Sequence, residues 1–169
     1  MARYYYLLIG FHDQTVAKRS ETGLLEKGFS IASGVEFRCR TAIWSSDHEN
    51  LFWLMIEPEG VSISSQTERW VQNSEQLDQV ADALYQTLMS IEKFACAIVG
   101  WEVADLFLPD ATRGYADMQI APNAFSDAGW HGLVISESLW TAIDKNKIFQ
   151  SFCDGYVWQP YRTLSVSGW

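Results

Sequence analysis

The stretch SEQLDQVADALYQTLMSIEKF, residues 74–94, carries the clearest helical pattern in the sequence. Its apolar side chains recur every three or four residues and form one stripe, made of Leu77, Val80, Ala81, Leu84, Leu88 and Ile91. Acids and glutamines occupy the other positions, as in a helix that buries one face and exposes the other. Asn73 is a suitable N-cap, with Gln76 three residues later as in a capping box. We therefore expect one long amphipathic helix over about 74–94.

Strand-like segments lie on both sides of this helix. They are short and rich in aromatic and β-branched residues, and several alternate apolar with polar side chains. The segments of this kind are residues 4–11, 35–44, 51–56, 61–63, 95–103, 133–135 and 156–161. Because strands outnumber helices and do not alternate strictly with them, the sequence predicts an α+β fold with a mainly antiparallel sheet.

The remaining segments have weaker patterns. Residues 13–24 are polar, which is typical of a loop or a short irregular helix. Residues 110–132 are rich in Gly, Pro, Asn and Asp, so we expect a long loop region of the kind that often carries function. Ser136 can cap a shorter helix near 137–144. We expect the sheet and both helices to form a single globular domain over residues 1–169.

The composition is that of an ordinary folded protein. The chain has 169 residues, of which 48% are hydrophobic and 20% charged, and this length can bury a core without a metal or disulfide. Cys39, Cys96 and Cys153 are odd in number and lack a C-x-x-C motif, which favours free thiols in a reducing compartment. No apolar run approaches the roughly 18 residues of a membrane helix, and residues 4–11 lack a signal peptide's cleavage site. We expect a soluble, cytoplasmic protein that does not bind a membrane.

The sequence contains no motif that fixes a chemistry. Phosphate-binding loops and the G-x-S-x-G nucleophile motif are absent. The cysteines and histidines lack the close pairs of a zinc site, so we expect no metal, and we expect no cofactor. His48 lies between two carboxylates and His131 between glycines, which could serve general acid–base chemistry, although turns explain both segments. A small hydrolase or ligand-binding enzyme using His131 or His48 with a nearby carboxylate is therefore an alternative hypothesis.

The distribution of charge is the most informative feature of the sequence. The net charge is −9, from 12 Lys and Arg against 21 Asp and Glu. Residues 1–46 are net +2, residues 47–117 net −10 and residues 118–169 net −1. Such acidity disfavours nucleic-acid binding, because phosphates are repelled. A solubilising surface would explain it, and so would a surface that docks a basic protein.

Aromatic residues favour the docking interpretation. They make up 14% of the chain, and several tryptophans lie in polar segments, as in tight protein-binding surfaces. The combination is typical of a non-enzymatic immunity-type inhibitor, the physical type of bacterial immunity proteins, which occludes a basic toxin or effector domain. The residues expected to contact that partner are Glu75, Asp78, Asp82, Asp105, Asp110, Asp117 and Trp130. A phage-type nucleic-acid mimic is a further alternative.

Overall fold

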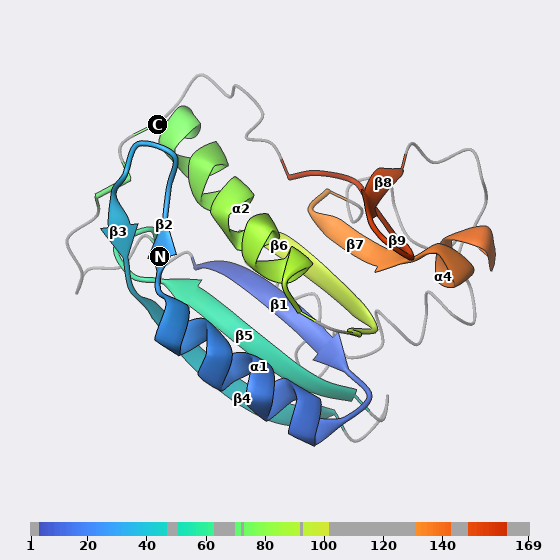
Figure 1. Cartoon of the computed structure of the whole chain (residues 1–169). Helices are drawn as coiled ribbons and strands as arrows, with labels where there is room; N and C mark the ends of the chain where they lie inside the picture. The colour runs from blue at the N-terminus through green and yellow to red at the C-terminus, as the bar shows by residue number, and fades with distance from the viewer. Residues whose placement is uncertain are drawn as a thin grey trace.

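The computed structural model describes residues 4–46, 51–62, 70–71, 73–91, 93–101, 131–142 and 149–161. Its strands are β1 (Tyr5–Phe11), β2 (Phe29–Ser30), β3 (Glu36–Phe37), β4 (Cys39–Ser46), β5 (Leu51–Pro58), β6 (Cys96–Trp101), β7 (Leu133–Ser136), β8 (Gln150–Cys153) and β9 (Tyr156–Trp158). Its helices are α1 (Gln14–Lys27), α2 (Ser74–Met89) and α4 (Glu137–Ala142). Seven strands form one sheet in the order β4-β5-β1-β6-β7-β9-β8, and β2 pairs with β3 in a second small sheet (Figure 1). Every described strand pair is antiparallel, so the predicted α+β class is confirmed.

The central strand β1 is buried on both faces of the sheet. It pairs with β5 and β6, so that Leu8 lies opposite Met55 on one side and Ile98 on the other. Its odd-numbered side chains join a core cluster with residues of α1 and α2, whereas Leu8 joins a second cluster that includes Leu139 of α4. A strand covered on both faces needs apolar residues at successive positions, which explains the continuous apolar run in the sequence.

Helix α2 is confirmed, with its predicted apolar stripe buried from Leu77 to Leu88. The side chain of Asn73 caps it by accepting a hydrogen bond from the backbone N–H of Gln76 at 2.9 Å. The helix ends at Met89 and not near residue 94. The chain turns there because it must enter β6, whose approach is fixed by the hydrogen bond from the Ala95 N–H to the Gly10 carbonyl at 2.7 Å.

Helix α1 corrects the sequence interpretation of residues 13–24 as a loop or a short irregular helix. It is a regular helix of 14 residues, and its N-cap Asp13 accepts a backbone N–H from the first turn at 2.7 Å. Only Ala17 and Leu24 are fully buried in it, two turns apart. The helix lies along β4 and β5 (Figure 1). So sparse an apolar pattern is hard to recognise, because packing on the sheet stabilises the helix more than intrinsic propensity does.

Two strand predictions also need correction. Residues 61 and 62 form a turn and not part of the exposed strand expected over 61–63, and residue 63 lies outside the described residues. The Ser62 hydroxyl accepts the Tyr5 N–H at 3.1 Å, so the turn is anchored to β1. Strand β8 was not predicted, because it buries only Phe152 and has an irregular register against β9.

The shorter helix is confirmed as α4 within the described residues. The Ser136 hydroxyl caps it by accepting the Leu139 N–H at 3.2 Å. Residues 143–144 of the expected helix, and residues 110–130 of the expected loop, lie outside the described residues. In the part of the chain that the structure describes, no helix is long and apolar enough to cross a membrane.

Candidate docking surface

The outer face of α2 carries three acids and no base. Glu75 and Asp82 are exposed and Asp78 is half-buried. Their spacing of three and four residues places them on one side of the helix, while the opposite side packs on the sheet. Three of the residues that the sequence assigned to partner binding therefore form one acidic surface, which we call the α2 acidic face.

The negative charge of this face also acts on the core beneath it. The Tyr5 side chain is fully buried at the start of β1. Burial, with the nearby hydroxyls of Tyr161 and Tyr85 and the carboxylates of Asp78 and Asp82, raises the pKa of Tyr5 well above its usual range. The two carboxylates are the smallest of these causes, after burial and the two hydroxyls.

A groove with a volume of about 520 Å³ adjoins the α2 acidic face. Gln79, Asp82 and Gln86 of α2 contribute to its lining, as do Lys27 at the end of α1 and residues 28–32, which follow it. The side-chain oxygen of Gln79 is buried and accepts no hydrogen bond from any described residue. A buried acceptor without a donor is destabilising and rare in folded proteins. The exposed carboxylate of Asp82 is the group in this lining that suits an ammonium or guanidinium group.

Sequence reasoning missed this groove. Its walls come from segments about fifty residues apart, which only the packing of α2 beside β2 brings together. Four other residues predicted to contact the partner lie outside the described residues, namely Asp105, Asp110, Asp117 and Trp130. His48, the other histidine of the enzyme hypothesis, also lies outside them.

His131 is exposed just before β7. The adjacent Gly132 has a φ of 86°, and its carbonyl accepts hydrogen bonds from the Val99 N–H at 3.0 Å and the Tyr85 hydroxyl at 3.2 Å. The glycine thus lets two parts of the chain approach each other, where the sequence had suggested the approach of a ligand.

The three cysteines are unbonded in the structure. Cys96 is buried, and Cys39 and Cys153 are half-buried. Burial, with the carboxylates of Glu59 and Glu57, raises the pKa of Cys39 well above its usual range, and burial also raises the pKa of Cys153. These two thiols stay protonated near neutral pH, which makes them poor nucleophiles and poor metal ligands. Among the described residues, no three His, Cys, Asp or Glu side chains are grouped as a metal ion would require.

Comparison with known proteins assigns the chain to no family. No family model, no curated protein and no solved structure matches it. Its function must therefore be inferred from the charges, pockets and contacts described above.

Proposed function

We propose that this chain is a non-enzymatic binding protein that docks a basic partner protein on the α2 acidic face and in the adjoining groove. The observation that carries the proposal is the group of acids on one side of α2, of which Asp82 also lines the groove. An arginine or lysine of the partner would donate to Asp82. The buried oxygen of Gln79 lacks a donor among the described residues, and it would accept from the partner once the side chain turns out into the groove.

The charge of the whole chain supports the same partner. A net charge of −9 attracts a basic protein from a distance and speeds their encounter. The three acids of α2 then orient the partner, because they face solvent on one side of a rigid helix. The groove supplies the close contact, which governs how long the complex lasts.

The finer proposal is an immunity-type inhibitor, which covers the basic active site of a toxin or effector domain. Asp105, Asp110, Asp117 and Trp130 would extend the contact beyond α2. We place the protein in the bacterial cytoplasm, where a reducing environment suits three unbonded cysteines. Inhibition would be steric and electrostatic, with no bond made or broken.

The test compares two triple variants with the same net charge. The docking variant combines Glu75→Gln, Asp78→Asn and Asp82→Asn. The control variant removes three exposed acids elsewhere, by Glu26→Gln, Glu137→Gln and Asp154→Asn. Both substitution sets keep side-chain size, and both change the net charge from −9 to −6. Only the loss of charge on α2 should impair docking.

The partner is first isolated from a lysate of the native host on immobilised wild-type protein, and binding is then measured by surface plasmon resonance. The docking variant should associate at least about tenfold more slowly than the control variant at low salt. The difference should vanish near 1 M salt, where the Debye length is about 3 Å. Equal association rates for the two variants would contradict docking on α2 and leave only an effect of net charge.

A single substitution tests the groove separately. Gln79→Leu removes the unpaired oxygen but keeps the side chain's bulk, so the free protein should be as stable as the wild type or more stable. The complex should dissociate about tenfold faster, because the donor of the partner would lose its acceptor. Unchanged dissociation would show that the partner does not use this oxygen.

A further inference from the structure

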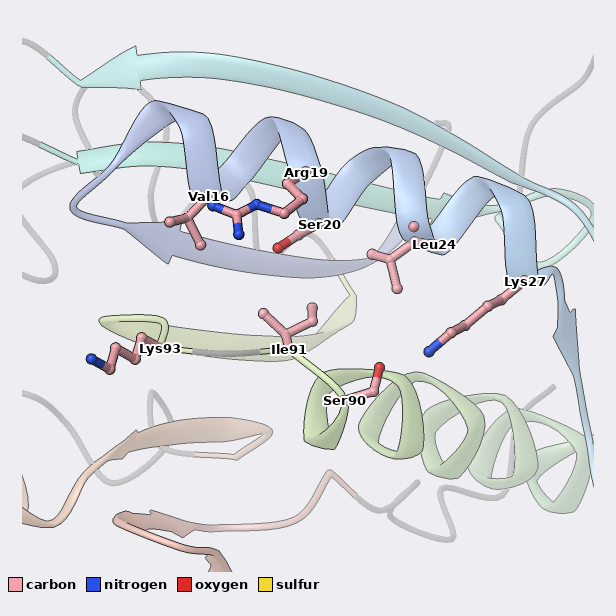
Figure 2. A pocket seen from close by; sticks show the side chains of 9 residues that line it. Val16, Arg19, Ser20, Leu24, Lys27, Ser90, Ile91 and Lys93 are labelled. Atoms are coloured by element: carbon pink, nitrogen blue, oxygen red, sulfur yellow. The ribbon is translucent and has the colours of Figure 1, made fainter.

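A pocket of about 290 Å³ lies between α1 and the C-terminal end of α2 (Figure 2). Apolar side chains of Val16, Leu24 and Ile91 contribute to its lining. Its polar lining consists of three cations and two hydroxyls, from Arg19, Lys27, Lys93, Ser20 and Ser90. No carboxylate is among the described residues that line it. The described part of the lining is therefore positive and partly apolar, in a chain whose net charge is −9.

The described acids balance the cations of this pocket only in part. Neither Lys27 nor Lys93 forms an ion pair with a described carboxylate, although Lys27 also lines the groove that Asp82 lines. Arg19 does act on Asp13 and helps to lower the pKa of that carboxyl, although the hydrogen bond from the Thr15 N–H is the largest cause. Two ammonium groups without an ion pair among the described residues favour an anion beside this pocket.

Two of the cations, Arg19 and Lys27, belong to α1, and none belongs to α2. In Figure 2, Lys27 extends from α1 towards Ser90, Arg19 lies along α1 towards Val16, and the Lys93 side chain extends away from Ile91 and Ser90. Lys93 comes from the segment between α2 and β6, where it adopts a φ of 48°. Among the described residues it is the one non-glycine residue with a positive φ. Such strained backbone is concentrated at functional sites.

The end of a helix normally repels anions, because its last carbonyls carry partial negative charge. Here two carbonyls of the last turn of α2 accept hydrogen bonds. The Thr87 carbonyl accepts hydrogen bonds from the Ser90 N–H at 3.0 Å and the Ser90 hydroxyl at 2.7 Å, and the Leu88 carbonyl accepts the Ile91 N–H at 3.0 Å. These hydrogen bonds reduce the partial negative charge of the carbonyls. The three cations of the lining counteract the partial charge that is left.

We propose that this pocket binds a small organic anion, in which a carboxylate or phosphate is attached to an apolar body. Lys27 holds the charged group beside Ser90, and Arg19 and Lys93 add positive charge to the lining. The apolar side chains cover the body, which distinguishes this ligand from a free inorganic ion. The volume suits a small molecule, being close to the lower limit of about 300 Å³ for ligand pockets. The acidity of the rest of the chain repels large polyanions such as nucleic acids.

The test needs no partner protein, so its result is independent of the docking proposal. The isotopically labelled full chain is titrated at low ionic strength with phenyl phosphate, benzoate, phenol and inorganic phosphate, and amide shifts are followed by NMR. Phenyl phosphate and benzoate should shift the amides of Ser20, Leu24, Ser90 and Ile91. They should bind at least about tenfold more tightly than phenol, which lacks the charge, or phosphate, which lacks the ring.

Variants of exposed lysines locate the binding. Lys27→Gln should weaken phenyl phosphate binding about tenfold, and Lys93→Gln should weaken it less, because only the Lys27 side chain extends towards Ser90. Lys18→Gln is the matched control, because Lys18 is exposed on α1 but does not line the pocket. Equal binding of phenol and phenyl phosphate, shifts centred elsewhere, or equal affinities for the Lys27 and Lys18 variants would each overturn the proposal.

Discussion

Adding one methyl group at Gly132 should destabilise the fold severely. Gly132 holds three elements together: its N–H donates to the Gln159 carbonyl at 2.8 Å, and its own carbonyl accepts from Val99 of β6 and Tyr85 of α2. Its φ of 86° lies in the left-handed region, which alanine adopts only with strain. A Cβ atom at this position would also overlap the carbonyl oxygen of Val99. That oxygen belongs to the backbone of a central strand, so it cannot simply move aside.

The expected loss follows from these contacts. The positive φ costs an alanine about 1 kcal/mol. Relieving the overlap moves Gly132 away from Val99 and disrupts three hydrogen bonds, each of which contributes about 1 kcal/mol net. Gly132→Ala should therefore lower the free energy of unfolding by about 4 kcal/mol. Gly155 is the matched control, since its φ is 78° but nothing lies within 4 Å of an added Cβ. Gly155→Ala should cost only about 1 kcal/mol.

Urea unfolding followed by tryptophan fluorescence separates the two variants. With a slope of about 2 kcal/mol per molar urea, Gly132→Ala should lower the unfolding midpoint by about 2 M and Gly155→Ala by about 0.5 M. If both variants lose the same stability, the close approach of Gly132 to Val99 is wrong and positive φ alone sets the cost. A Gly132 variant as stable as the wild type would refute both parts of the reasoning.

Other predictions concern the helix and the cysteines. Leu84→Ala removes a fully buried side chain from the apolar stripe of α2 and should lower the free energy of unfolding by about 2–5 kcal/mol. Asp82→Ala on the exposed face should change it by about 0.5 kcal/mol or less. Equal losses of stability in urea unfolding would contradict the orientation of α2. Because the pKa of Cys39 is raised, its thiol should react with a disulfide reagent at pH 8 far more slowly than free cysteine, and its rate should still rise above pH 9. Denaturation without reductant should expose three reactive thiols, and a count of one would reveal a disulfide.

The sequence predicted a helix or strand well where many buried residues recur at a regular spacing, and poorly where few residues are buried. Helix α2 buries six residues and so has a clear period, whereas α1 buries only Ala17 and Leu24, and its sequence predicted a loop or a short irregular helix. The acids of α2 were predictable as an exposed face for the same reason. The groove beside them was not, because the role of Gln79 depends on which distant segment packs opposite it. No local pattern distinguishes that glutamine from Gln86 on the same helix.

The arrangement of charge on α2 argues that its acids do more than keep the protein in solution. A solubilising helix usually mixes both signs, because an acid and a base four residues apart stabilise each other. Helix α2 has no base in its 16 residues, and Asp78 and Asp82, four residues apart, repel each other by about 0.2–0.5 kcal/mol. Three bases lie instead on α1, and Lys93 follows α2. Glu75 in the first turn stabilises α2 through the helix dipole, but Asp82 lies beyond that turn. A cation bound beside Asp82 would relieve its repulsion with Asp78.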